Sequence, residues 1–300
     1  MKRCEELERE RRSLAAMAYY NALENWAYGK EYDDEALSDA IKVLDKLCLD
    51  CYSDEFVVTI SKGDVFYRGR KIEANDCGCP ENGIIYDEEK KMFRGFNAKE
   101  SGEPPKEKSK AGRLSRQGEA ALYLAEDPIT ACIECGTQMR QMVSLARYKV
   151  VKDIKIIDFS KLEYKESLAK YDEECKVDVR QFLSYICALF TYYVYDDKEY
   201  IFTQKLADHF REKGFNGFAY RSFHTNKRNY TFFDEDRKNF SWLDSNILLN
   251  YASANHFMSL DDEKGDLENR NILDETIEEK VREKIISNTK SMIVKKQLEK

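Results

Sequence analysis

Hydrophobic residues recur at steps of three and four through the first 47 positions, which is the spacing of one face of an α-helix. We expect two helices there, the first over about 5–28, before Gly29, and the second starting near Asp33. The second shows the clearer pattern, carried by Leu37, Ala40, Ile41, Leu44 and Leu47. The chain therefore begins with a helical module.

From residue 56 the pattern changes to short runs of β-branched and aromatic residues, which favour strands. The first two runs, 56–60 and 65–68, flank a turn at 62–64. Further strands are expected at 121–125, 147–151, 155–159, 217–221 and 230–233. Helices are expected at 160–170, 176–194, 199–213 and 273–297.

Local signals mark the ends of two helices. Asp127 and Pro128 follow the run 121–125, and they are typical of an N-cap and a first helical position. Gly214 is expected as the C-cap of the helix at 199–213. Residues 76–118 carry no clear element, which marks that segment as functional or mobile.

Composition narrows the class of protein. Lys and Arg number 49 against 56 Asp and Glu, a net charge of −7, which argues against direct nucleic-acid binding. The longest uncharged run has 15 residues, fewer than the roughly 20 of a membrane helix. Nine scattered cysteines, an odd number, favour reduced thiols in the cytoplasm. These features indicate a globular cytoplasmic protein without a membrane partner.

Candidate metal and phosphate sites each have an ordinary alternative. Cys48-x-x-Cys51 with Cys77-x-Cys79 would supply four thiolates for zinc, although Cys48 also lies on an apolar helix face, where cysteine packs as a hydrophobe. The basic stretch from Lys106 to Arg116 would cradle a phosphate or form a solvated loop. The three histidines show no catalytic or metal-binding spacing.

A third group of residues joins a strand to a helix. Gly112-Arg113 precedes the strand 121–125, and Glu134 follows within an apolar stretch of the next helix. A carboxylate in such a stretch is costly unless it is paired or used, or else it faces solvent. Arg68 and Ser222 stand at the ends of two other expected strands.

At these positions the sequence resembles the RES-domain family, named for an Arg, a Glu and a Ser. The resemblance runs from about Gly63 to Thr225, in eight pieces that keep the order of the family. The pieces are Val65-Phe66-Tyr67-Arg68-Gly69-Arg70, Gly95-Phe96-Asn97 with Ser101-Gly102-x-Pro104-Pro105, Gly112-Arg113, Leu122-Tyr123-Leu124-Ala125, Thr130-Ala131-x-x-Glu134, Ile156-Ile157-Asp158-Phe159, Thr203-Gln204-x-Leu206-Ala207 and Gly214-Phe215-x-Gly217-Phe218-x-Tyr220-x-Ser222.

The resemblance implies an α+β fold like that of the ADP-ribosyltransferases, with a split β-sheet and surrounding helices. It divides the chain into a helical module (1–55), a RES domain that binds NAD (56–260) and a charged helical tail (261–300). It also implies an enzyme that needs no cofactor and consumes NAD⁺ as a substrate, releasing nicotinamide together with ADP-ribose or its phosphate. Such an enzyme is usually the toxin paired with a helix-turn-helix antitoxin; the oligomeric state is left open.

The resemblance also assigns residues to roles. Arg68, Glu134 and Ser222 are the name-giving catalytic residues, and Arg68, Ser222, Arg113 and Tyr123 would bind NAD⁺. Glu134 would stabilise a positively charged, oxocarbenium-like transition state, and the two arginines would clamp the pyrophosphate. The stretch that follows Arg113 departs from the family, whose members more often have Asn-Pro there.

Two other functions are compatible with the sequence. The protein would be an ADP-ribosyltransferase if a protein side chain took the ADP-ribose. It would be a non-catalytic interaction module, helical or zinc-bound, if its cleft were inactive.

Overall fold

The computed structural model describes residues 34–77, 84–160, 179–191, 200–225, 227–250, 257–259 and 279–299. The chain forms two compact units, and each unit combines three separate stretches of sequence. Unit 1 comprises Met1–Ser61, Pro104–Leu122 and Asp153–Arg237, and unit 2 comprises Lys62–Glu103, Tyr123–Lys152 and Lys238–Lys300. The expected division into 1–55, 56–260 and 261–300 follows the chain instead, and it stays a prediction.

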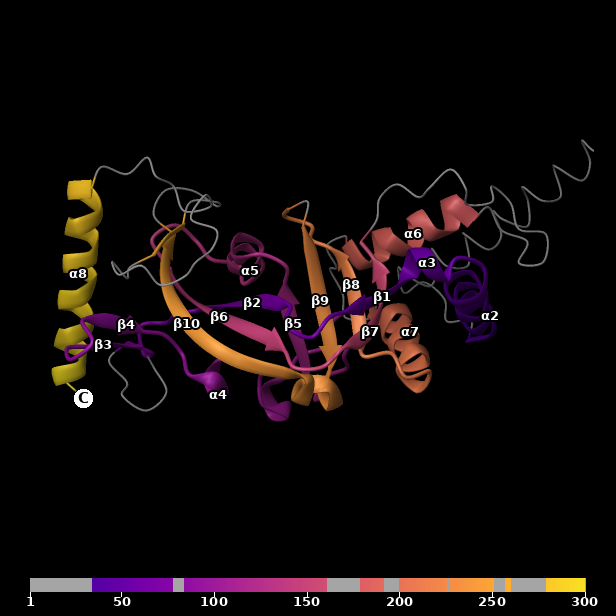
Figure 1. Cartoon of the computed structure of the whole chain (residues 1–300), viewed down its shortest axis with the longest axis horizontal. Coiled ribbons are helices and arrows are strands. Elements are labelled where there is room, and N and C mark those ends of the chain that lie inside the picture. Colours follow the sequence, from indigo (N-terminus) through magenta and orange to yellow (C-terminus); the bar gives the residue numbers. More distant parts are fainter. Residues whose placement is uncertain are drawn as a thin grey trace, which may run out of the picture. The chain divides into compact units, whose positions relative to one another are not determined.

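Unit 1 is built on four strands, labelled in Figure 1. In order they are β1 (Val57–Ile60), β7 (Ile154–Phe159), β8 (Gly217–Arg221) and β9 (Arg228–Phe233). β7 and β8 run parallel, and the other neighbouring pairs are antiparallel. The strands predicted at 56–60, 155–159, 217–221 and 230–233 are confirmed to within two residues.

Helices of unit 1 come from both ends of its sequence. They are α2 (Asp34–Asp45), the π-helix η1 (Lys46–Cys51), α3 (Ser53–Phe56), α6 (Val179–Thr191) and α7 (Ile201–Glu212). The helices expected at 5–28 and 160–170 lie outside the described residues. The C-cap of α7 is Lys213 rather than Gly214, which stands one residue later with a φ of +85°.

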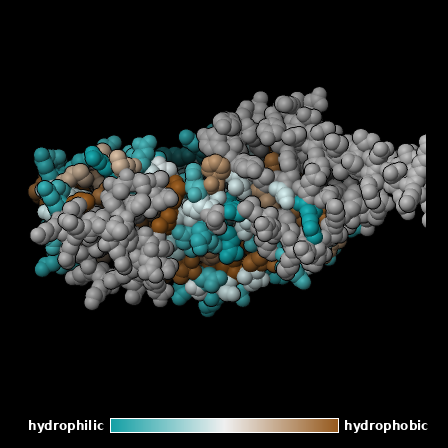
Figure 2. Space-filling view, turned by 90° about the horizontal axis from the view of Figure 1, so that it is seen from above, coloured by the Kyte–Doolittle hydropathy of each residue, from teal (hydrophilic) through white to brown (hydrophobic). Residues whose placement is uncertain are grey.

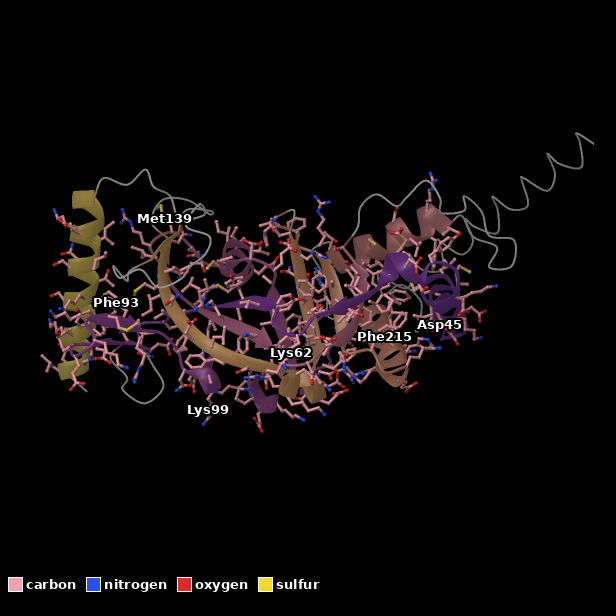
Figure 3. The ribbon with its side chains drawn as sticks, viewed as in Figure 1. Asp45, Lys62, Phe93, Lys99, Met139 and Phe215 are labelled. Carbon is pink, nitrogen blue, oxygen red and sulfur yellow. The ribbon has the colours of Figure 1, made fainter. Side chains whose placement is uncertain are left out.

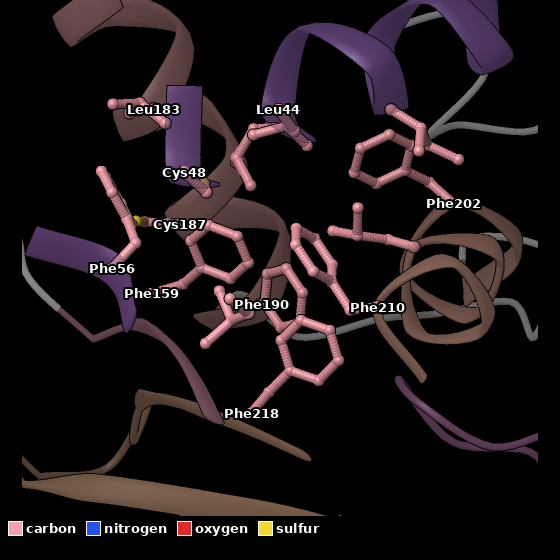
Figure 4. Packing of buried hydrophobic residues seen from close by; sticks show 14 of the residues in the cluster. Leu44, Cys48, Phe56, Phe159, Leu183, Cys187, Phe190, Phe202, Phe210 and Phe218 are labelled. Carbon is pink, nitrogen blue, oxygen red and sulfur yellow. The ribbon is translucent and has the colours of Figure 1, made fainter. Parts of the chain in front are cut away.

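Aromatic rings dominate the core of unit 1 (Figure 4). The ring centroid of Phe190 lies 5.1 Å from that of Phe159 and 5.7 Å from that of Phe218. Leu44 and Cys48, from α2 and η1, belong to the same buried cluster. The N-terminal helices therefore share the core of the strands and of α6 and α7. The removal of these apolar side chains from water is the main source of stability for the unit.

Unit 2 contains the longest strand among the described residues. Its strands in order are β5 (Ala121–Ala125, from Tyr123 on), β2 (Val65–Lys71), β6 (Met142–Val150), β10 (Phe240–Asn250) and β11 (Phe257–Ser259). All neighbouring pairs are antiparallel, and β10 curves along β6 with a register shift between Trp242 and Asp244 (Figure 1). The sequence pattern did not predict β10.

The segment 76–118 contains short elements, so the expectation that it carries none was wrong. They are β3 (Ile85–Asp87), β4 (Met92–Arg94), α4 (Ala98–Ser101) and the 3₁₀-helix η2 (Lys106–Lys108). β3 and β4 pair with each other and pack against α8 (Glu279–Leu298), so tertiary contacts stabilise them. Phe93, labelled in Figure 3, is buried in this cluster together with Ile293 of α8.

Helices and mixed strands together confirm the predicted α+β class. Large exposed hydrophobic side chains occur singly in the described residues and are Met92, Met139, Val151, Phe223, Leu243, Met292 and Leu298. On the face shown in Figure 2, hydrophobic residues stand among hydrophilic ones, as on ordinary protein surfaces. Within the described ranges, every helix is too short or too polar to cross a membrane.

Candidate functional site

Arg68 lies in β2, where this strand meets β5. The two strands are in register at Tyr67 and Ala125, and one residue further along β2 the Nη1 of Arg68 donates to the carbonyl oxygen of Tyr123 at 3.3 Å. At this point the hydrogen bond from β2 to β5 comes from the side chain of Arg68. Among the described residues, β5 and β2 are neighbours in one nine-stranded sheet, so the expected split of the sheet is not confirmed.

The side chain of Arg68 is partly buried. Its Nε is buried and has no hydrogen-bond partner among the described residues. Burial lowers the pKa of Arg68, while Glu103 and the neighbouring tyrosines partly oppose that effect. A partly buried cation whose Nε is buried and unused is costly, because the desolvation of that donor is not repaid. An anionic ligand at this position would remove that cost.

Tyr123 is the residue of β5 that accepts the hydrogen bond from Arg68 of β2. It is the only partly exposed residue of that strand, whose other four side chains are buried. Its carbonyl oxygen accepts the hydrogen bond from Arg68, and its side chain is partly exposed. A half-buried tyrosine of this kind presents an apolar face and a polar tip.

The helix α5 (Pro128–Glu134) carries the candidate carboxylate. The side chain of Asp127 accepts hydrogen bonds from the backbone N–H groups of Ile129 and Thr130, and Pro128 occupies the first turn, as predicted. Glu134 is the last residue of the helix and is exposed. The exposure of Glu134 leaves its carboxylate accessible, and its catalytic role stays a prediction.

Gly69 sets how closely α5 approaches β2. A Cβ atom at this position would lie 2.3 Å from the carbonyl oxygen of Ala131 and 3.3 Å from the Cα of Cys132. Side chains alternate between the two faces of a strand, so Arg68 leaves β2 on the face opposite to α5. Arg68 and Glu134 both belong to unit 2. The side chain of Arg68 leaves β2 on one face, and α5, which carries Glu134, packs on the other face. Sequence reasoning gave Gly69 no role, and its position beside Arg68 was the available signal.

Arg113 lies in unit 1, at a tight turn. Its Nη1 donates to the carbonyl oxygen of Leu189 at 3.0 Å, and its guanidinium carbon lies 6.0 Å from the ring centroid of Tyr200. Two other cations of the basic stretch pair with carboxylates of unit 1. Lys106 lies 3.1 Å from Asp234, and Arg116 bonds Asp208 at 2.5 Å. Charge pairing of this kind is typical of a solvated loop.

Ser222 follows β8 directly and is buried. Its Oγ accepts hydrogen bonds from the backbone N–H groups of His224 and Thr225, both at 3.1 Å. Its backbone N–H donates to the carbonyl of Lys227 at 2.9 Å. The hydroxyl oxygen thus accepts two hydrogen bonds that stabilise the turn after β8. Ser222 and Arg113 belong to unit 1.

The cysteines proposed for zinc lie in different surroundings. Cys48 is in the core of unit 1, where burial raises the pKa of its thiol well above the ordinary range. Cys77 is in the core of unit 2, and Cys79 lies outside the described residues. Among the residues that the structure describes, no three His, Cys, Asp or Glu side chains are grouped to hold a metal ion. The described geometry supports the packing alternative for Cys48.

Comparison with known proteins identifies the family. A model of the RES domain matches residues 86–249, more than half of the chain, and the chain therefore belongs to the RES domain family. No curated protein matches the chain, and no solved structure matches it. The family generally comprises NAD-related, toxin-like proteins, which indicates an enzymatic role that acts on NAD.

The matched range includes four of the five candidate residues, namely Arg113, Tyr123, Glu134 and Ser222. Arg68 precedes the range, so its assignment depends on the shorter motif around β2. The range also continues beyond Thr225 through most of β10, which the resemblance read from the sequence had left out.

Proposed function

We propose that this RES-domain protein consumes NAD⁺ by cleaving the bond between the nicotinamide nitrogen and the C1′ of ribose. The observation that carries the proposal is Arg68, whose buried Nε has no partner among the described residues. Leaving a buried donor unsatisfied costs about 1–3 kcal/mol, which a pyrophosphate oxygen would restore. A guanidinium fork fits phosphate oxygens with two parallel hydrogen bonds, so NAD⁺ suits this position.

The reaction needs little help from a general acid. When the bond between nitrogen and C1′ breaks, its electron pair goes to the positively charged nicotinamide, which leaves as a neutral molecule. A water molecule then adds to the oxocarbenium-like C1′ and loses a proton, which gives ADP-ribose. The carboxylate of Glu134 would stabilise the positive charge in the transition state. This role suits an exposed carboxylate at a helix end, which substrate can reach.

The other candidate residues would bind and orient the substrate. The guanidinium of Arg113, in unit 1, would bind a phosphate oxygen of the substrate. The ring of Tyr123 would stack on or enclose the nicotinamide. The hydroxyl of Ser222, at the end of β8, would form a hydrogen bond with a ribose hydroxyl or with the amide of the nicotinamide.

As a toxin-like enzyme of this kind, the protein would act in the cytoplasm as part of a toxin–antitoxin pair. Its partner would be a helix-turn-helix protein that blocks access to NAD⁺. Coexpression with that partner is expected to restore the growth of cells that the active enzyme inhibits.

The test is release of nicotinamide from NAD⁺ by the purified full chain. Glu134→Gln keeps the size of the side chain and removes its charge, so we expect release to fall by about 100-fold or more. Glu126→Gln is the matched control, because Glu126 is a half-buried glutamate just before the same helix. Equal release by the wild type and Glu134→Gln would remove Glu134 from the mechanism.

The same assay separates the alternative functions. Radiolabelled ADP-ribose attached to protein instead of free in solution would identify an ADP-ribosyltransferase. If the wild type releases no nicotinamide, even with phosphate and protein acceptors supplied, the protein is an interaction module instead.

A further inference from the structure

The helix α7 contacts the segment Gly112–Arg116 through three residues spaced by four. They are Tyr200, which immediately precedes the helix, Gln204 and Asp208, and we call them the α7 stripe. Residues four apart lie on the same face of a helix, so the stripe is one continuous surface along one side of α7. All of these residues belong to unit 1.

The middle of the stripe holds the backbone of a tight turn. Gly112 donates to the carbonyl of Ser115 at 2.8 Å, and Ser115 donates back at 3.4 Å. The Nε2 of Gln204 donates to the carbonyl oxygens of the same two residues, at 2.9 Å and 3.1 Å. Leu114 is buried in the core, so the turn is anchored by its apolar residue as well as by Gln204.

Gln204 has the chemistry that this position requires. It is 8% exposed, and one amide nitrogen supplies both of the hydrogens that two inward-facing carbonyl oxygens need. A glutamate would bring a charged acceptor against those oxygens, and an apolar side chain would leave both without that donor. An asparagine in place of Gln204 would carry the same amide, but its side chain is one carbon shorter.

The two ends of the stripe hold arginine side chains on either side of the turn. At one end the ring of Tyr200 lies beside Arg113. At the other end the carboxylate of Asp208 accepts two hydrogen bonds from Arg116, at 3.1 Å and 2.5 Å. Two-point pairing fixes the plane of a guanidinium as well as its position. The segment is therefore held at its backbone and on both flanks by one helix.

We infer that Gln204 is a positioning residue, which fixes the turn at Gly112–Ser115 and so directs the guanidinium of Arg113 toward the pyrophosphate of NAD⁺. The inference rests on the proposed function for the role of Arg113, whereas the hold on the turn rests on the contacts above. Arg113 is one residue from Gly112, so a change in that carbonyl plane turns the side chain directly. Small misplacements of a binding group weaken substrate binding strongly.

Gln204→Met tests the inference, because methionine keeps the length of the side chain and has no N–H. Hydrogen–deuterium exchange of peptides that cover residues 109–119 should rise. The Michaelis constant for NAD⁺ should rise about tenfold, while kcat changes by less than about twofold, as expected for lost binding. Thr203→Val is the matched control: Thr203 is buried on the same helix, but its hydroxyl bonds the carbonyl of Tyr200.

A double-mutant cycle with Arg113→Gln shows whether Gln204 acts through Arg113. If it does, the double variant binds NAD⁺ no worse than Arg113→Gln alone, because the misdirected side chain is already absent. Additive losses, or unchanged exchange in Gln204→Met, would overturn the inference. If Gln204→Met does not fold, Gln204→Asn keeps a neutral amide on a stem one carbon shorter and draws it away from the two carbonyl oxygens, and unchanged exchange in that variant overturns the inference equally.

The proposed function and the inference fail in different ways. A wild type that releases no nicotinamide contradicts the proposed function. Exchange of the peptides at 109–119 still decides whether Gln204 positions the turn, because that measurement needs no substrate.

Discussion

Replacing Gly69 by alanine should force α5 away from β2. The added Cβ would lie 2.3 Å from the carbonyl oxygen of Ala131 and 2.9 Å from its carbonyl carbon. Both obstacles are backbone atoms, so no side-chain rotation relieves the contact. Carbon and oxygen atoms in close contact lie about 3.3 Å apart, so the helix and strand must separate by about 1 Å.

That separation opens a small buried cluster in which Ala131 and Cys132 of α5 lie against Val143 and Leu145 of β6. Overpacking of this kind costs about 1–3 kcal/mol, and the rigid backbone on both sides places Gly69→Ala near the upper end. A loss of about 3 kcal/mol corresponds to a fall of about 5 °C in the unfolding midpoint for a chain of this size.

Thermal unfolding followed by circular dichroism measures the effect, and hydrogen exchange of α5 locates it. Gly214→Ala is the control, because nothing lies within 4 Å of a Cβ at Gly214. Its φ of +85° still costs about 1 kcal/mol for an alanine, so the midpoint should fall by about 1–2 °C. Exchange of α5 should rise in Gly69→Ala alone. If α5 exchanges as in the wild type and Gly69→Ala unfolds no lower than the control, the close approach of α5 to β2 is refuted.

Three further outcomes are expected. Arg68→Lys keeps the charge but loses the fork, so the Michaelis constant for NAD⁺ should rise about tenfold; an unchanged constant contradicts the clamp. Iodoacetamide should label exposed Cys51 before Cys48 or Cys132, because burial raises the pKa of both buried thiols; mass spectrometry of digests reads the order. Gln297→Leu removes the side-chain bonds of α8 to the edge of β3, at 3.0 Å and 3.3 Å, and should destabilise unit 2 by about 1–2 kcal/mol; early exchange of β3 checks it.

Local signals in the sequence predicted local structure well. The cap of α5 is an example, since Asp127 and the N–H groups that it accepts from are two and three residues apart. The run 217–221 became β8 with the expected bounds. In each case the residues that determine the structure are neighbours in the chain, so their pattern is visible without knowledge of the fold.

β10 was missed because its stability comes from a distant partner. The stretch from Phe240 to Asn250 mixes apolar and polar residues, with Asp244 near its middle. That carboxylate pairs with Arg147 of the neighbouring strand β6, and β10 follows β6 over most of its length. Strand pairing of this kind depends on residues about a hundred positions apart, and no window of sequence contains both partners.

The candidate site shows the same division. Sequence motifs named Arg68, Arg113, Tyr123, Glu134 and Ser222 as candidates, and their side-chain types suit NAD chemistry. The contacts that surround them, such as the bond from Arg68 to the carbonyl of Tyr123, were invisible, because 55 residues separate the partners.

The sequence by itself determined the α+β class, the RES-domain family, the N-cap of α5 and the identity of the candidate residues. The tertiary structure decided which contacts hold these elements in place. Gly69 allows α5 to pack closely on β2, and the oxygen of Ser222 accepts hydrogen bonds from the turn after β8. Gln204 of α7 binds the backbone of the turn that contains Arg113. The physical reason is range. Caps and periodicity act between near neighbours, whereas close packing and buried hydrogen bonds join groups that only folding brings together.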